Sequence, residues 1–532
     1  MKRRFFAPEI LSCLAAGGVM LVHPLIFDDF YFNINRFKHA FYLYAAGGCL
    51  LLHWILCLWN HAPLLRRPSF AGGAMAAFLL LAGISCALSE WPGDAFTGQN
   101  GRLCGLLFLL AVGAMAYIAS GARNAGRFAV IGLLLSGFLC ACLSLANFFG
   151  FDPLGFTPRM KKTDLADFIS TIGNLDFFGA FLCLTLPASA AVFARLPAPR
   201  TVKGDSAPRG ASCAVFADAS PVSAPLTRVI RVFSGLNLIV GSMACVAARA
   251  DCALFGILFS LLALLLSGAN DRKRMDAGLS LLLLGLASLS LLCRAFPNHH
   301  FSLNRQNGAY LLRAPYLTAA VCAALGALSI LPRKKHRISP ERWTRIWALV
   351  LILILLAGAA AFVRFSFFDL ETELDGPLRL LRFDDLWGSY RGGVWTRCLR
   401  LYAEAGLRVW LFGYGPDCLK TPLAERFGAE IAEYSHRSFN NAHNEILQYL
   451  LTHGALGLLS YLVLVFGAVC ALKKRAARDA FSAAQLAGTL AYFVCSLVNI
   501  NQPITTPLFF MLMTAGILAR PRRESASAKA VF

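Results

Sequence analysis

The sequence predicts an all-α, polytopic integral membrane protein with about 14 transmembrane helices and one large helical loop on the outer side. Hydrophobic residues make up 57% of the 532 residues, charged residues make up 15%, and the mean hydropathy is +0.60. A soluble protein of this size needs far more polar surface than this composition offers. The apolar residues also come in blocks of about 20, the length of helix that crosses a hydrocarbon core ~30 Å thick.

The apolar blocks define the order of the predicted spans. No A-x-A-like cleavage site follows the first block, so we expect it to remain a helix and not to be removed as a signal peptide. Each boundary carries a margin of about four residues. The predicted spans lie near residues 7–27, 40–60, 70–89, 102–120, 127–149, 176–195, 229–248, 252–268, 277–293, 314–331, 346–366, 446–472, 483–499 and 504–519.

The net charge of +21 is explained by membrane topology and not by binding to nucleic acid. Basic residues gather in alternate loops, and the predicted spans place all of these clusters on one face. Short cytoplasmic loops carry the excess of Lys and Arg, so both termini are predicted to be cytoplasmic. The clusters are Lys2–Arg4, Arg66–Arg67, Arg123 with Arg127, Arg272–Arg274, Arg333–Lys335, Lys473–Arg475, and Arg520 with Arg522 and Arg523.

Two long interruptions divide the chain into three predicted parts. Residues 1–366 form an N-terminal bundle of about 11 helices, interrupted by a Pro-, Ala- and Ser-rich cytoplasmic linker at 196–228. Residues 367–445 form the large outer loop, and residues 446–532 form the last helices with a short cytoplasmic tail. Within the outer loop, "GGVWTRCLRLYAEAGLRVWLFG" has apolar residues at helical spacing, which predicts a small ordered helical cap.

Ionisable residues at the outer ends of the spans indicate a functional site. Arg102 begins a span, Arg249 lies in a short turn between two spans, Arg391 lies in the loop, and His443 stands where the loop re-enters the membrane. Placing an ionisable residue at membrane depth costs free energy, so such a residue suggests a functional site. The arginine fork suits phosphate, and histidine can take a proton from a hydroxyl near neutral pH. Together they predict transfer chemistry on a lipid diphosphate, without a nucleotide.

Each of these residues also allows a structural interpretation. Arg102 and Arg249 could snorkel toward the headgroups, and Arg391 could lie on the surface of the cap. His443 could cap its helix or bond a backbone carbonyl. Asn444 and Gln448 are four residues apart and share one helix face, where they could serve as hydrogen bonds between helices. The 17 cysteines include no C-x-x-C pair, so neither a zinc site nor a disulfide framework is indicated.

The stretch "AHNEILQYLLTHGALGLLSYL" resembles the H-N-x-x-L-Q-x-x-x-x-x-G-x-x-G signature of the O-antigen ligase and O-antigen polymerase superfamily. The matching residues are His443, Asn444, Leu447, Gln448, Gly454 and Gly457. The loop resembles the same family through R-x-x-x-W and G-x-G-P, which fall on Arg391, Trp395, Gly413, Gly415 and Pro416.

Three earlier segments are similar to the family less completely. Arg249 matches its S-R-G-A turn, and Arg102 matches its G-x-x-x-R-x-x-G segment. Gly173 and Asn174 match its G-T-x-G-N-x-N segment, where Asp176 replaces the second asparagine.

The resemblance implies a metal-independent membrane glycosyltransferase of the bacterial inner membrane, with a cavity open to the periplasm. Such enzymes move a glycan from undecaprenyl diphosphate to a lipid or glycan acceptor hydroxyl, such as lipid A–core, and no cofactor is implied. By position, Arg249 and Arg391 would bind the diphosphate and His443 would activate the acceptor. The remaining substrate-binding residues would be Arg102, Asn444, Gln448, Trp395 and Asn174.

A ligase-like enzyme is the leading hypothesis, and a polysaccharide polymerase or protein O-oligosaccharyltransferase of the same superfamily is the alternative. A membrane transporter or lipid flippase is a distant alternative, because transporters show polar or broken helices near the midplane, often in matched halves. Here the ionisable residues gather at the outer ends of the spans. We expect His443, Arg249 and Arg391 to converge within about 10 Å around one substrate.

Overall fold

The computed structural model describes residues 8–29, 31–99, 101–156, 158, 160–161, 167–196, 223–267, 271–296, 339–374 and 376–519. Within these ranges nine helices are long and apolar enough to cross a membrane, and three shorter apolar helices accompany them. The all-α polytopic prediction is confirmed. The predicted span at 314–331, most of the linker at 196–228, and the basic clusters at 2–4, 333–335 and 520–523 lie outside the described residues.

The helices follow the predicted order of spans. The first eight elements of the bundle are α1 (Pro8–Leu25), α2 (Ile34–Trp59), α3 (Phe70–Ala87), α4 (Pro92–Thr97), α5 (Leu106–Ala119), α6 (Ala125–Phe148), α7 (Leu175–Arg195) and α8 (Ala224–Ala247). The later ones are α9 (Ala253–Ser267), α10 (Arg272–Ala295), α13 (Pro340–Val363) with a π-helical turn η4 (Arg364–Phe368), α17 (Glu445–Ala476), α18 (Ala480–Ser496) and α19 (Thr506–Thr514).

Helix α7 is the central helix of the bundle. Most of its side chains are buried, and it packs against α6, α8, α9 and α18. It begins directly after an antiparallel hairpin of two short strands, β1 (Phe168–Ile169) and β2 (Gly173–Asn174), in which Phe168 pairs with Asn174. Helix α13 is the opposite case, because its apolar window has no buried residues and its side chains face outward as on a lipid-exposed helix.

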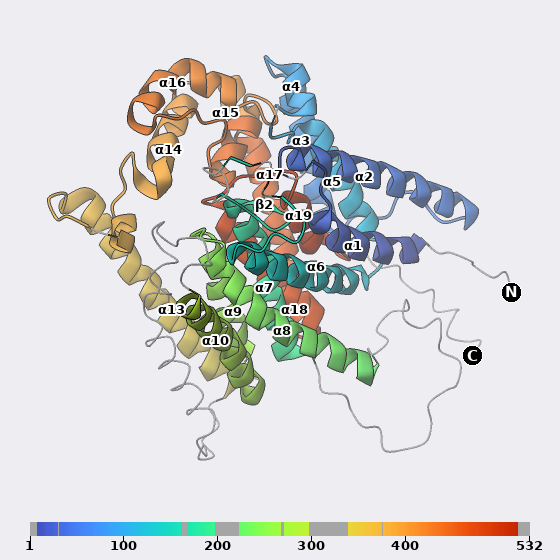
Figure 1. Ribbon diagram of the computed structural model, residues 1–532. Coiled ribbons are helices and arrows are strands. Elements are labelled where there is room, and N and C mark those ends of the chain that lie inside the picture. The colour runs from blue at the N-terminus through green and yellow to red at the C-terminus, as the bar shows by residue number, and fades with distance from the viewer. Residues whose placement is uncertain are drawn as a thin grey trace, which may run out of the picture.

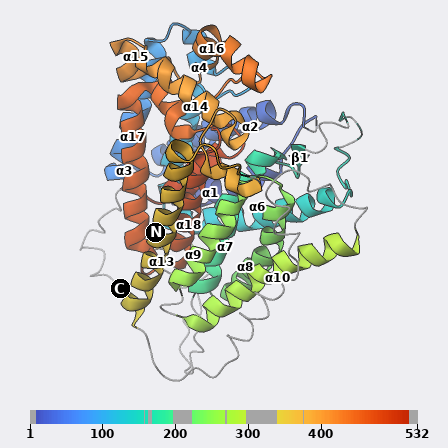
Figure 2. The ribbon, with the colours of Figure 1, turned by 90° about the vertical axis from the view of Figure 1, so that its left-hand side faces the viewer.

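Residues 367–445 contain the predicted helical cap, which we define as α14 (Trp387–Ala403), α15 (Leu407–Phe412), α16 (Lys420–Ser435) and the segments that join them. A short 3₁₀ helix, η5 (Gly376–Leu381), precedes it. Figure 1 shows the cap helices together at one end of the molecule, close to α4 and above α17. Figure 2 shows α17 running from the cap into the bundle, where it packs against α3 and α18.

The G-x-G-P turn fastens the cap to a break in α17. Helix α17 is interrupted at Gly454, whose φ is +68°. The backbone N–H groups of Tyr414 and Gly415 donate to the carbonyl oxygens of Leu451 (2.8 Å) and Thr452 (3.0 Å). The break therefore leaves carbonyl groups that the cap satisfies, as buried backbone groups require. The two glycine-containing turns approach so closely that a Cβ on Gly413 would lie 2.3 Å from the carbonyl carbon of Thr452.

Replacing Gly413 by alanine is expected to loosen the cap. The φ of Gly413 is +79° and its ψ is −174°, a conformation that costs an alanine on the order of 3 kcal/mol even before the contact with Thr452. We expect a lower melting temperature and faster proteolysis within the cap. Gly406→Ala is the matched control, because Gly406 has a negative φ and open space around it. Equal melting temperatures for the two variants would contradict this fastening role.

The end of the chain departs from the predicted pair of spans. Helix α18 ends at Ser496, and α19 has only nine residues, about 14 Å of helix at 1.5 Å per residue. The segment between them, residues 497–505, is irregular and largely buried, and we call it the buried loop. Irregular backbone at membrane depth is tolerated only where protein or a water-filled space surrounds it. Its buried polar residues are Asn499, Asn501, Gln502 and Thr505.

Candidate functional site

Three of the predicted residues meet where the cap joins the bundle. His443 lies in the turn that precedes α17, and the charges of Arg391 and Arg102 both act on its imidazole. Burial, followed by these two positive charges, lowers the pKa of His443 to about 3. The imidazole is therefore neutral at physiological pH, and the same two positive charges oppose its protonation while no substrate anion is bound. A side chain from α14, one from the segment before α5 and one from the turn before α17 thus share one electrostatic environment.

The turn that carries His443 is held by side chains around it. His443 has a φ of +50°, a left-handed conformation that a non-glycine residue adopts at a cost. Its backbone N–H donates to Asn441 Oδ1 (2.8 Å). Gln448 Oε1 accepts from the N–H of Ala442 (3.0 Å), and Trp395 Nε1 donates to the Ala442 carbonyl (2.9 Å). These bonds hold the strained backbone in place, and the ring of Phe439 packs edge-on against the imidazole, with ring centroids 5.5 Å apart.

Asn444, and not His443, caps helix α17. Asn444 Oδ1 accepts from the N–H of Leu447 (3.0 Å), as an N-cap residue does. The turn is therefore held by hydrogen bonds made by Asn444, Gln448 and Trp395. Their predicted contacts with substrate stay predictions. Of the structural interpretations considered above, capping of α17 by His443 is wrong.

Arg102 is positioned by the cap. Its guanidinium donates from Nε (3.2 Å) and Nη2 (2.9 Å) to Asn440 Oδ1, three residues before His443. Asp417 in the cap is buried, and its Oδ2 accepts from the backbone N–H groups of Gln99 (2.9 Å) and Cys104 (3.1 Å). Burial raises the pKa of Asp417 to about 6, although these two N–H groups and the charge of Arg102 oppose the shift. The cap and the Arg102 segment therefore form one connected unit.

Arg391 joins the cap to the first turn of α7. Its Nη2 lies 3.3 Å from Asp176 Oδ2, and its Nη1 donates to the Gly388 carbonyl (2.9 Å). The three residues before it, Gly388, Ser389 and Tyr390, all have positive φ values. The Asp176 side chain is 45% exposed, against 18% for that of Arg391, so the carboxylate is open to solvent and the surrounding water weakens the pair. A diphosphate could therefore replace Asp176 at the guanidinium at little cost.

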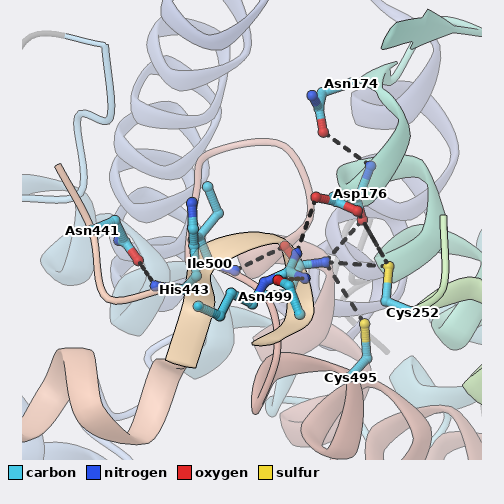
Figure 3. A network of polar contacts seen from close by, with 10 residues as sticks. Asn174, Asp176, Cys252, Asn441, His443, Cys495, Asn499 and Ile500 are labelled. Atoms are coloured by element: carbon cyan, nitrogen blue, oxygen red, sulfur yellow. Dashed lines mark hydrogen bonds and ion pairs between the residues drawn. The ribbon is translucent and has the colours of Figure 1, made fainter. Parts of the chain in front are cut away.

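The first turn of α7 is surrounded by polar and sulfur atoms, as Figure 3 shows. Asn174 caps the helix, because its Oδ1 accepts from the Asp176 N–H (2.9 Å). The Asp176 carbonyl accepts from Asn499 Nδ2 (2.9 Å) and from the thiol of Cys252 (3.6 Å). Asn174 thus lies two residues before the carboxylate that pairs with Arg391, and its predicted substrate contact stays a prediction.

Arg249 lies in the turn between α8 and α9, three residues before Cys252. Like His443 it is half-buried and left-handed, with a φ of +55°. Since Cys252 contacts Asp176, the turn that carries Arg249 packs against the residue that pairs with Arg391. Strained non-glycine backbone recurs at functional sites. The roles predicted for Arg249, Arg391 and His443 are not tested by this geometry, but the elements that carry them do adjoin one another.

The structure adds residues that sequence reasoning did not select. Asp176 was noted only as a departure from the family pattern, yet it is the ion-pair partner of Arg391. Asn440 and Asn441 precede the histidine and bond Arg102 and the His443 backbone. The signal that could have found the buried loop is the polar run "NINQPITT" between two apolar blocks.

A comparison with known protein families matches part of this chain. The family model described as O-antigen ligase matches residues 308–462, a range that contains α13, the cap and the first half of α17. No curated protein matches this chain. The predicted resemblance to the O-antigen ligase superfamily is confirmed over the matched range. With the multi-pass helical fold, the match supports a ligase- or polymerase-like membrane glycosyltransferase in general terms.

Proposed function

We propose that this protein transfers a glycan from undecaprenyl diphosphate to an acceptor hydroxyl at the cap end of the bundle. A ligase acting on lipid A–core or a similar acceptor is the first candidate. The observation that carries the proposal is the position of His443 in a hydrogen-bonded turn beside Arg102, which donates to Asn440 Oδ1 (2.9 Å) three residues earlier, with the charge of Arg391 also acting on the imidazole. One group suits an acceptor that must lose a proton, and the other two suit a leaving group that gains negative charge.

The proposed reaction needs only the two substrates. The acceptor O–H bond breaks, and its proton moves to His443. The acceptor oxygen bonds to the anomeric carbon of the donor sugar, whose bond to the diphosphate oxygen breaks. The electron pair leaves with the diphosphate, where Arg391, Arg102 and Arg249 would stabilise its charge. The protein supplies position and electrostatics, which are the largest contributions in many enzymes.

A polymerase is the second candidate, because the same groups would serve a glycan acceptor as well as a lipid acceptor. A protein hydroxyl acceptor is a third variant of the same chemistry. A transporter or flippase fits less well, because Arg102 and Arg391, whose charges act on His443, belong to segments at the junction of the cap and the bundle, whereas transporter sites lie near the midplane.

Transfer by the purified protein in detergent or nanodiscs tests the proposal. The assay contains a diphosphate-linked glycan donor and one acceptor class at a time. We expect a new glycosidic product with at least one acceptor, as a single capped species for a ligase or a ladder for a polymerase. Movement of intact donor across a vesicle, without any new glycosidic bond for every acceptor class, would reject the proposal and favour a flippase.

A further inference from the structure

The buried loop lies between the two halves of the candidate site. On one side, Asn499 Nδ2 donates to the main-chain oxygen of Asp176 (2.9 Å). On the other side, Asn441 Nδ2 donates to Asn501 Oδ1 (3.4 Å). Figure 3 shows Asn499 and Ile500 between Asp176 and the His443 turn. Two amides of one short segment therefore contact the donor side and the acceptor side separately.

These contacts lead to the backbone of His443 at one end and to the guanidinium of Arg391 at the other. Asn441 Oδ1 accepts from the His443 N–H (2.8 Å), and Asp176 Oδ2 pairs with Arg391 Nη2 (3.3 Å). Within the loop, the N–H of Ile500 donates to Asn499 Oδ1 (2.8 Å). A run of polar contacts therefore connects the histidine turn to the arginine through three residues of backbone.

The loop is stiff enough to act as a spacer. Asn499 and Asn501 are only 5% and 7% exposed. Gln502 Oε1 accepts from the N–H groups of Ile504 (2.5 Å) and Thr505 (3.2 Å), so the second half of the loop satisfies its own backbone. Tyr492 and Thr505 hydroxyls, 3.1 Å apart, tie it to α18. Buried irregular backbone held in this way has few alternative conformations.

We propose that Asn499 and Asn501 are positioning residues, which set the spacing between Arg391 at the diphosphate and His443 at the acceptor. This inference rests on the proposed function and adds residues to the same site. Transfer requires the acceptor oxygen and the anomeric carbon to be held close together and aligned, and a displacement of about 1 Å can cost a factor of 10². The buried loop contacts both halves of the site and would hold them in that alignment, although it is distant from both in the sequence.

The test compares three variants of the full-length protein. Asn501→Leu removes the contact with Asn441, and Asn499→Leu removes the contact with Asp176. Asn501→Leu is expected to lower kcat and raise the acceptor KM, about tenfold in kcat/KM, while the donor KM stays within about twofold. Asn499→Leu is expected to raise the donor KM instead. Thr505→Val is the control for loosening of the loop in general, because it removes the bonds to Tyr492 of α18 and to Gln502 but touches neither Asp176 nor Asn441.

Two results would overturn this role of the loop. The first is a change that affects the donor KM and the acceptor KM equally in all three variants, which indicates general damage to the loop. The second is wild-type kinetics in both asparagine variants. Hydrogen exchange separates this question from the proposed function: Asn501→Leu should speed exchange in residues 439–447, and Thr505→Val should not. Unchanged exchange there in Asn501→Leu overturns this role of the loop, whereas absence of any transfer by the wild type overturns the proposed function alone.

Discussion

Replacing His443 by alanine is expected to lower the transfer rate by about 10²–10⁴-fold, the contribution that a positioned general base makes. The protein should still insert and fold, because the turn is held by Asn441, Gln448 and Trp395 and not by the imidazole. The measurement is kcat with saturating donor and acceptor, next to a melting curve. The donor KM should change little, since the diphosphate contacts are assigned to the arginines.

His436→Ala is the matched control for that variant. His436 follows the last residue of α16, in the same connecting segment as His443, and also has a left-handed backbone, with a φ of +54°, but it is exposed. Replacing His436 shows how much activity is lost when a histidine with a similar backbone conformation is removed from the same segment. Wild-type activity in His443→Ala, or an equal loss in His436→Ala, would remove the assignment of His443 as the base.

The pH dependence of the wild type provides a second readout for the same residue. In the free protein His443 has a pKa of about 3, so kcat/KM for the donor should not fall until the pH approaches that value. A bound diphosphate would offset the charges of Arg391 and Arg102, and the pKa of the imidazole would rise. The acid limb of kcat should therefore lie at higher pH than the acid limb of kcat/KM, and His443→Ala should lose both limbs.

Hydropathy was sufficient to predict the fold class, and short motifs selected the candidate site residues, whose roles stay predictions. Apolar blocks of membrane length do not depend on partners elsewhere in the chain, so the spans follow from local composition. The isolated arginines and the histidine stand out because ionisable residues are rare at membrane depth. The helical spacing in "GGVWTRCLRLYAEAGLRVWLFG" likewise predicted the cap, where α14 and α15 lie.

The remaining features depend on contacts between distant segments. Trp395 and Gln448 bond the same residue, Ala442, from opposite sides, and no local pattern predicts that meeting. The predicted spans, 483–499 and 504–519, included both ends of the buried loop and left only residues 500–503 between them, because a polar run of eight residues interrupts two apolar blocks only briefly. Asp176 looked like an imperfect match to an amide motif until its partner Arg391, 215 positions away in the chain, was in place.

Replacing Arg391 by alanine is expected to lower transfer by about 10²–10³-fold, the effect of removing one donor that stabilises a developing negative charge. The variant also leaves Asp176 without its partner, and its carboxylate would then repel the incoming diphosphate. The loss should therefore appear in the donor KM as well as in kcat. Arg391→Lys should recover only part of the activity, because an ammonium group cannot reproduce the planar fork.

The double variant Arg391→Ala with Asp176→Asn separates these two effects. Neutralising Asp176 removes the repulsion, so the double variant should bind donor more tightly than Arg391→Ala while its kcat stays low. Asp176→Asn alone should lower the donor KM by a few-fold, since the diphosphate no longer displaces a carboxylate from the guanidinium. If the two substitutions were simply additive, the ion pair would not matter for donor binding. If Arg391→Ala transferred glycan at the wild-type rate, the guanidinium would have no part in stabilising the leaving group.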